Sequence, residues 1–298
     1  MNGVLVIDKP AGFTSFDVVA KLRGILKMKK IGHGGTLDPQ ATGVLQVFIG
    51  EATRLCDYLP DDEKIYEAEM TLGVSTDTGD IWGEVREEDR EKAAALTEEE
   101  VRKAVLSFKG PYEQIPPMVS AKKVDGKKLY EYARKGVEIE RKPVSLTIYD
   151  ISVDHMDLPR VRFTVNCSKG TYIRVLCEDI GKKLGVPACM SALRRVRHGR
   201  FDIASAVSLD TVETAAHEGK AEMLLIPTEA LFDHPKVKVS GEAEKRLKNG
   251  NKMPCTAFPE VTAERICVYD SQGRFNAVYK RNEKEGMYIP EKMFIPRD

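Results

Sequence analysis

The residues of this chain best suited to chemistry lie in the segment 32–39, which is Gly-His-Gly-Gly-Thr-Leu-Asp-Pro. Its glycines at 32, 34 and 35 permit backbone angles and close approaches that other residues cannot make, and Pro39 restricts the backbone of Asp38 before it. We therefore expect a stiff turn that presents the Asp38 carboxylate, a placement that suits a nucleophile or a general base. The alternative is that Asp38 only caps backbone amides of its own turn, as most aspartates in turns do.

Strands and helices on both sides of this segment must position the carboxylate. A Thr-x-x-Asp capping box at Thr14 and a Thr-x-x-Glu box at Thr97 each predict a helix start, and a third helix is expected from Tyr172 to Leu184. Buried or alternating apolar residues predict strands at residues 3–7, 43–49, 66–72, 144–152 and 161–167. This irregular order of strands and helices indicates an α+β fold with a mixed, largely antiparallel sheet.

The bulk composition predicts a soluble globular protein with one large domain or two. Of the 298 residues, 42% are hydrophobic and 31% are charged, and no apolar run reaches membrane-spanning length. The N-terminus does not resemble a signal peptide. The six cysteines form no C-x-x-C pair and have no histidine at ligand spacing, so we expect reduced thiols, a cytoplasmic location and no metal site.

The formal net charge is zero, which by itself argues against a nucleic-acid partner. The charges are nevertheless segregated, because acidic residues crowd positions 84–100 while basic residues cluster elsewhere. The basic clusters contain Lys27, Lys29, Lys30, Lys122, Lys123, Lys127, Lys128, Arg194, Arg195, Arg197 and Arg200. Such segregation can build one positive face on a neutral protein, although any single cluster is explained as well by ordinary solvated surface.

Four segments, in order along the chain, resemble the motifs of the TruB family, the tRNA pseudouridine-55 synthases. They are Val6–Ser15 (V-I-D-K-P-A-G-F-T-S), Gly32–Leu45 (G-H-G-G-T-L-D-P-x-A-T-G-V-L), Ser168–Arg174 (S-K-G-T-Y-I-R) and Leu193–Arg195 (L-R-R). The matches span nearly all of the first 230 residues. One such segment would be weak evidence, whereas four in the family's order identify the chain as similar to it over most of its length.

The resemblance implies three catalytic residues. Asp38 is the carboxylate that acts on the uridine, and Tyr66 is the tyrosine that stacks on the flipped base. Arg174 is the arginine that pairs with Asp38 and keeps it ionised and oriented. Without the resemblance, Tyr66 is a strand tyrosine that packs into the core. Arg174 is then an arginine among apolar helix neighbours, which usually has an acidic partner.

Further residues are expected, by the same resemblance, to bind substrate or RNA. His33 would insert into the RNA loop where the target uridine leaves it, and Tyr172 and Leu193 would line the base pocket. Lys9 is assigned to this group too, although it looks structural and could support the Asp38 loop. The remaining two are Lys122 and Arg195.

The domain prediction is a catalytic domain over residues 1–233, with a basic, RNA-contacting insertion at about 112–142. Within it, Gln114–Lys122 resembles a family segment but has Val119 in the usual tyrosine position. A short helix at about 241–248 and a hairpin after it indicate a small second domain at 235–298. Its position and strand pattern resemble the PUA-type RNA-binding domain that follows many family members.

The expected activity is therefore isomerisation of a uridine in the T loop of tRNA, at position 55, to pseudouridine. Reactant and product have the same composition, so no cofactor is expected, in keeping with a sequence that has no P-loop or dinucleotide fingerprint. The expected partner is the T arm of tRNA, with no membrane and no obligate protein partner. The alternative is a non-catalytic RNA-binding protein or tRNA-folding chaperone that uses the same basic face.

Overall fold

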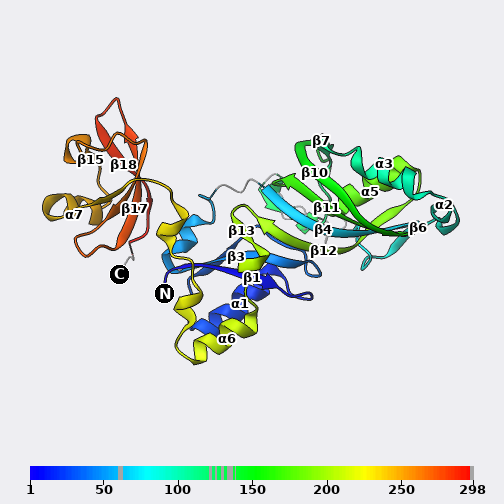
Figure 1. Cartoon of the computed structure of the whole chain (residues 1–298), viewed down its shortest axis with the longest axis horizontal. Coiled ribbons are helices and arrows are strands. Elements are labelled where there is room, and N and C mark those ends of the chain that lie inside the picture. The colour runs from blue at the N-terminus through cyan, green and yellow to red at the C-terminus, as the bar shows by residue number, and fades with distance from the viewer. Residues whose placement is uncertain are drawn as a thin grey trace.

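The structure is a computed structural model that describes residues 1–59, 63–120, 123–124, 126–128, 131–132, 137 and 139–295. Its centre is a nine-stranded sheet with the order β1-β3-β12-β4-β11-β10-β7, to which β2 and β13 add beside β3 and β12 (Figure 1). The strands are β1 Gly3–Lys9, β2 Ile31–Gly34, β3 Thr42–Ile49, β4 Glu63–Leu72, β7 Gly110–Gln114, β10 Val144–Asp157, β11 Arg160–Ser168, β12 Ala188–His198 and β13 Phe201–Asp202.

Neighbouring strands of this sheet are antiparallel at every junction except that of β3 with β12, which is parallel. The predicted α+β class with a mixed, largely antiparallel sheet is thus confirmed. The parallel junction is short and pairs Arg194 with Thr42 and Arg195 with Gly43. It brings the end of the Asp38 loop against the C-terminal part of β12.

Local sequence signals define the helix ends. At α1 (Ser15–Leu26), the Thr14 hydroxyl accepts a hydrogen bond from the Asp17 amide, and the Asp17 carboxylate accepts one from the Thr14 amide. The Thr97 box opens α3 (Glu98–Leu106) in the same way, so both predicted helix starts are confirmed. The helix expected at 172–184 is α5 (Ile173–Leu184), and it ends where Gly185 adopts the left-handed conformation.

Helices cover the two halves of the sheet separately. At one end, α1 and α6 (Leu209–His217) bury their apolar faces against β1 and β3, in a cluster that contains Val18, Leu22 and Val212 (Figure 1). At the other end, α3 and α5 pack on β4, β10 and β11 in a second cluster. The Asp38 loop runs between these two halves, so each half of the core fixes one side of it.

Residues after the main sheet form a second, five-stranded sheet with the order β14-β16-β17-β18-β15 (Figure 1). Its elements are β14 Lys236–Lys238, α7 Gly241–Lys248, β15 Met253–Pro254, β16 Arg265–Tyr269, β17 Phe275–Asn282 and β18 Met287–Met293. The predicted helix at 241–248 and the hairpin after it are confirmed. This sheet packs on the first through a shared apolar cluster that includes Phe48, Phe232 and Val278, and Tyr58 donates to the Glu291 carboxylate across the junction (2.7 Å).

The smaller helices and strands are α2 Arg90–Ala94, β5 Val74–Thr76, β6 Val85–Glu88, β8 Lys123–Val124 and β9 Lys127–Lys128. Short 3-10 helices lie at Gly50–Leu55, Ile203–Ser205, Ala221–Leu224, Thr228–Leu231 and Cys255–Ala257. The segment predicted as an insertion at about 112–142 begins within β7, so its first residues belong to the main sheet. No helix within the described ranges is long and apolar enough to cross a membrane.

The close approach of β3 to β12 predicts that Gly43→Ala is strongly destabilising. Gly43 has φ +98°, and a Cβ there would overlap the carbonyl oxygen of Arg195. We expect a loss of about 2–4 kcal/mol in the free energy of unfolding, measured by urea denaturation. The matched control is Gly273→Ala, where φ is +78° but no heavy atom lies within 4 Å. It should lose only about 1–2 kcal/mol, the cost of the left-handed backbone alone, and an equal loss in both variants would contradict the steric argument.

Candidate active site

The loop that carries Asp38 runs from the end of β2 to the start of β3. Of its three glycines only Gly35 has a left-handed backbone (φ +64°), and a Cβ there would overlap the ring of His198. Gly34 is needed for space, because a Cβ would lie 2.9 Å from Oε1 of Gln46. Gly32 has no left-handed backbone, and a Cβ there would come no closer than 3.4 Å to another residue. The expectation that the loop requires a glycine at position 32 is therefore wrong. The loop is thus held close to β3 and β12 by two glycines.

Lys9 anchors this loop from the protein interior. Its Nζ donates to the carbonyl oxygens of Pro10 (2.9 Å), Phe13 (2.6 Å) and Pro39 (2.9 Å), and the side chain is 0% exposed. Burial lowers the Lys9 pKa to about 8. The assignment of Lys9 to direct RNA contact is therefore wrong, because all three ammonium hydrogens point at the protein. The contacts of Lys9 instead fit its alternative role, which is to support the Asp38 loop.

Ser15, the first residue of α1, fixes the same loop from a second side. Its Oγ accepts a hydrogen bond from the Leu37 amide (2.9 Å) and lies 3.3 Å from the Leu37 carbonyl oxygen. The amide of Gly12 donates to the Pro39 carbonyl (3.0 Å). The residues before and after Asp38 are thus both tied to the β1–α1 connection, which leaves its carboxylate in a fixed place.

The Asp38 carboxylate meets a buried arginine. Nε of Arg174 lies 3.0 Å from Oδ2 of Asp38, and Nη2 lies 3.5 Å from Oδ1. The Arg174 side chain is 5% exposed and that of Asp38 is 41% exposed, so the carboxylate faces outward from a buried cation. No backbone amide of the described residues donates to this carboxylate. The interpretation of Asp38 as a simple turn cap is therefore wrong.

Arg174 is itself oriented by two carbonyl groups that the sequence does not reveal. Nη1 donates to the carbonyl of Thr78 (2.7 Å) and Nη2 to that of Val119 (3.0 Å). Arg174 is the second residue of α5, where the helix dipole disfavours a cation, so these acceptors and Asp38 together offset the cost. Val119 contributes its backbone while its side chain is exposed. Because the contact uses the backbone, having valine in place of the usual tyrosine at position 119 does not remove this hydrogen bond to Arg174.

A cavity of about 240 Å³ opens beside this ion pair. Its walls include six residues that the sequence singled out, namely Asp38, Tyr66, Tyr172, Arg174, Leu193 and Arg195. Asp38 is the only acidic residue among the described lining. The sequence analysis missed Lys64 and Ser120, which also line the cavity. Lys64 could have been found from the alternation along β4, because it lies two positions before Tyr66 and therefore on the same face of the strand.

Tyr66 and Arg195 are cross-strand partners on β4 and β12, and both line this cavity. Burial is the main cause that raises the Tyr66 pKa to about 12, so the phenol is neutral at neutral pH. Arg195 is 0% exposed, and its Nε and Nη2 donate to the carbonyls of Val44 and Gly35 (both 2.8 Å). Its Nη1 has no hydrogen-bond partner among the described residues. Any substrate group that meets Arg195 must therefore enter the cavity.

Two other predicted residues lie outside this constellation. His33 is a half-buried residue of β2, paired with Val47, rather than a side chain that projects from a loop. It is not among the described lining of the cavity. Lys122 lies outside the described residues. His33 thus belongs to the same sequence motif as Asp38, but its side chain is not part of the described cavity wall.

This arrangement suits chemistry on a small planar group. A single oriented carboxylate can attack carbon or remove a proton, and the adjacent aromatic ring can stack on a ring that enters. Buried cations surround the carboxylate at Lys9, Arg174 and Arg195, which favours negative charge in the cavity. The described residues contain no group of three or more His, Cys, Asp or Glu side chains that could hold a metal ion.

Comparisons with known proteins agree over the whole chain. Residues 23–173 match the model of the TruB family pseudouridylate synthase N-terminal domain, and residues 174–233 match that of the tRNA pseudouridylate synthase B C-terminal domain. A protein of Bacillus subtilis (strain 168) named tRNA pseudouridine synthase B is 43% identical, over 100% of this chain and 99% of its own length. One of the same name from Lachnoclostridium phytofermentans is 46% identical, over 99% and 100%.

Solved structures give the same architecture at lower identity. A chain in an H/ACA RNP bound to a substrate RNA containing 2'-deoxyuridine is 26% identical, with a TM-score of 0.68, over 99% of this chain and 86% of that one. A chain in a Cbf5-Nop10-Gar1 complex is also 26% identical, with a TM-score of 0.67 and the same coverage. The fold is thus shared well beyond the close relatives.

The burial of Lys9 predicts that Lys9→Met destabilises the protein and that its effect depends on pH. The substitution leaves three carbonyls without their donor, so we expect a loss of about 2–4 kcal/mol near pH 7, measured by chemical denaturation. In the wild type the folded pKa of about 8 lies below the unfolded value of 10.5. The folded state then binds fewer protons between these values, and stability rises with pH in that window. The gap between wild type and Lys9→Met should therefore widen from pH 8 to 10, and a constant gap would contradict a buried ammonium.

Proposed function

This chain belongs to the TruB family of pseudouridylate synthases, and we propose that it isomerises uridine 55 in the T loop of tRNA to pseudouridine. The observation that carries the proposal is the Asp38–Arg174 pair at the mouth of a cavity that also contains Tyr66. Full-length relatives at 43–46% identity are named for this activity. The chain is thus an RNA-modifying isomerase.

The reaction needs little beyond one carboxylate and a place for the base. The bond from N1 of uracil to C1′ of ribose breaks, the base turns, and a new bond forms from C5 to C1′, while the C5 proton moves to nitrogen. We propose that Asp38 supplies the reactive oxygen, either by adding to sugar or base or by removing the C2′ proton. In both cases Arg174 keeps the carboxylate aimed at the substrate.

Tyr66 and Arg195 are proposed to receive the flipped uracil. A neutral phenol ring can stack on the base, an interaction that contributes about 1–3 kcal/mol. Nη1 of Arg195, which has no partner among the described residues, can then donate to a uracil oxygen. Negative charge that develops on the base as the N1–C1′ bond breaks would be stabilised by this guanidinium.

Recognition of the tRNA is proposed to involve surfaces outside the cavity. His33 adjoins the Asp38 loop and is the side chain proposed to enter the RNA loop, with Lys122 as a further contact. The second sheet, within residues 235–298, is proposed to act as a PUA-like RNA-binding unit beside a catalytic domain at 1–233. We expect the enzyme to work in the cytoplasm, where its tRNA substrate is, and without an obligate protein partner.

The direct test compares wild type with Asp38→Asn on an unmodified tRNA transcript. We expect wild type to form pseudouridine at position 55 and Asp38→Asn to be slower by at least about 10³-fold, because the reactive oxygen is lost. Affinity for the transcript should change by less than about 3-fold, since the substitution removes chemistry and not phosphate contacts. Binding without product in either protein would favour a tRNA-folding chaperone. Equal product from both would show that Asp38 is not the reactive group.

The contacts of Arg174 with three separate acceptors predict the outcome of Arg174→Lys. Lysine keeps the charge, but its single ammonium cannot take the places of Nε, Nη1 and Nη2, which reach Asp38, Thr78 and Val119 from three different points, so the carboxylate should lose its fixed direction. We expect kcat to fall about 10²-fold with KM nearly unchanged, since a misplacement of about 1 Å costs this much. Arg102→Lys, an exposed change on α3, is the matched control and should leave both constants as they are. A fall in kcat/KM carried by KM alone would argue against a positioning role.

A further inference from the structure

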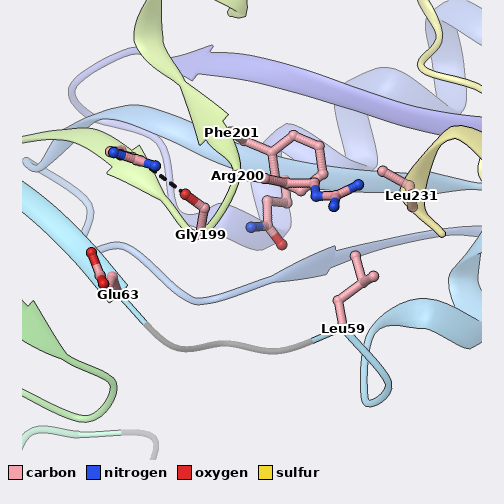
Figure 2. A pocket seen from close by; sticks show the side chains of 8 residues that line it. Leu59, Glu63, Gly199, Arg200, Phe201 and Leu231 are labelled. Carbon is pink, nitrogen blue, oxygen red and sulfur yellow. Dashed lines mark hydrogen bonds between the residues drawn. The ribbon is translucent and has the colours of Figure 1, made fainter. Parts of the chain in front are cut away.

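A cavity of about 350 Å³, shown in Figure 2, opens on the opposite face of the main sheet from Asp38. Glu63 lines it, whereas the next residue along β4, Lys64, lines the catalytic cavity, and successive residues of a strand point to opposite faces. Arg200 in its wall is already paired with Asp233 (3.4 Å). This cavity is therefore separate from the site, and the buried polar network that adjoins the site lies on the other face of the sheet.

Gln114 is a buried glutamine at the end of β7, and its carboxamide binds the start of α5. The residue is 1% exposed. Its Oε1 accepts a hydrogen bond from the Tyr172 amide (2.8 Å), and its Nε2 donates to the Tyr172 carbonyl (3.0 Å). One side chain thus pairs with both backbone groups of one residue, as the facing residue of a neighbouring strand would. Because β7 is an edge strand of the described sheet, Gln114 extends the hydrogen-bonded ladder to the helix start.

The carboxamide of Gln114 is itself held in place. Nε2 also donates to the Tyr112 hydroxyl (3.1 Å), which in turn donates to Oδ2 of Asp179 in α5 (2.6 Å). Burial is the main cause that raises the pKa of Tyr112, so its phenol stays protonated and can donate. Both hydrogens of the carboxamide are therefore used, and its oxygen and nitrogen cannot exchange places without loss of these bonds.

Tyr172 depends on this contact because its own side chain does not cap α5. It is the N-cap residue of the helix, and it makes no side-chain cap hydrogen bond within the described chain. Helices usually begin with a short polar side chain that accepts from the first amides. The two bonds from Gln114 fix the backbone of Tyr172 instead, and Arg174 follows two residues later. Both Tyr172 and Arg174 line the catalytic cavity.

Gln114 also begins the segment that holds Arg174 from the other side. Later in that segment, the Val119 carbonyl accepts a hydrogen bond from Nη2 of Arg174 (3.0 Å), and the next residue, Ser120, lines the cavity. The helix that carries Arg174 and the segment that orients its guanidinium are therefore joined at Gln114. A shift of its carboxamide would displace the two relative to each other.

We propose that Gln114 is a positioning residue for the reaction at Asp38. Its carboxamide sets the start of α5 against β7, and thereby fixes the place of the Tyr172 ring and the direction in which Arg174 aims the carboxylate. Gln114 is not among the described lining of the catalytic cavity, so it acts through these two residues and not by contact with the substrate. The proposal rests on the proposed function, because its measure is the rate of pseudouridine formation.

The test compares Gln114→Met with Tyr112→Phe in single-turnover pseudouridine formation on an unmodified tRNA transcript. Methionine keeps the length of the side chain but loses all three hydrogen bonds, so we expect the rate to fall about 10²-fold, as a misplacement of about 1 Å does. The dissociation constant, measured by filter binding, should change by less than about 3-fold, since no phosphate contact is removed.

Tyr112→Phe is the matched control because it belongs to the same buried network. It removes the bonds of the hydroxyl to Gln114 and Asp179 but keeps both bonds from Gln114 to Tyr172. Its melting temperature should therefore fall, while its rate should stay within about 3-fold of wild type. An equal loss of rate in both variants would overturn the proposal, and so would a loss carried by the dissociation constant alone.

Gln114→Glu keeps the test decisive if Gln114→Met does not fold. Glutamate has nearly the same shape and can still accept from the Tyr172 amide, but as a carboxylate it cannot donate to the Tyr172 carbonyl. We expect a rate about 10-fold below wild type at an unchanged dissociation constant. Wild-type rates from the Gln114 variants would overturn the positioning role alone, whereas absence of product from wild type would overturn the proposed function with it.

A double-mutant cycle tests whether Gln114 acts through Arg174. In the Arg174→Lys background the carboxylate has already lost its fixed direction, so only the effect through Tyr172 remains. Gln114→Met should then lower the rate by about 10-fold or less, compared with about 10²-fold in the wild-type background. The same 10²-fold loss in both backgrounds would show that the two residues act independently, and the proposal would fail.

Discussion

The ion pair of Asp38 with Arg174 is the interaction on which the site depends. It joins a loop at the end of β2 to the first turn of α5, 136 residues later in the chain. A buried guanidinium with no anion would be costly, so the pair couples correct closure of the fold to correct placement of the carboxylate. Disruption of either partner should therefore affect the stability of the site as well as its chemistry.

Around this pair the protein uses backbone carbonyls in place of further side chains. The ammonium of Lys9 donates to three backbone carbonyls, and the guanidinium groups of Arg174 and Arg195 each donate to two. Carbonyls are neutral, so they satisfy the hydrogen-bonding groups of a cation without cancelling its charge. The cavity consequently keeps an excess of positive charge close to Asp38. That excess suits a substrate whose base becomes negative as its bond to the sugar breaks.

The parallel junction of β3 and β12 fixes one wall of the cavity beside Asp38. It places Gly43 beside Arg195, and the close approach leaves no room for a side chain. This short pairing therefore sets where Arg195 lies relative to the Asp38 loop.

The sequence by itself determined the local elements and the residues of the candidate active site. Capping boxes at Thr14 and Thr97 set helix starts through contacts three residues apart, and the motifs singled out Asp38, Tyr66 and Arg174, which the structure brings to one cavity. Only the tertiary structure decided that Lys9 is buried, that His33 lies in a strand, and that Thr78 and Val119 hold Arg174. The physical reason is that the deciding contacts join a side chain to a backbone group far away in the chain, as Lys9 does with Pro39 and Arg174 with Thr78. Every residue has the same carbonyl, so no side-chain pattern can reveal which of them a buried cation will meet.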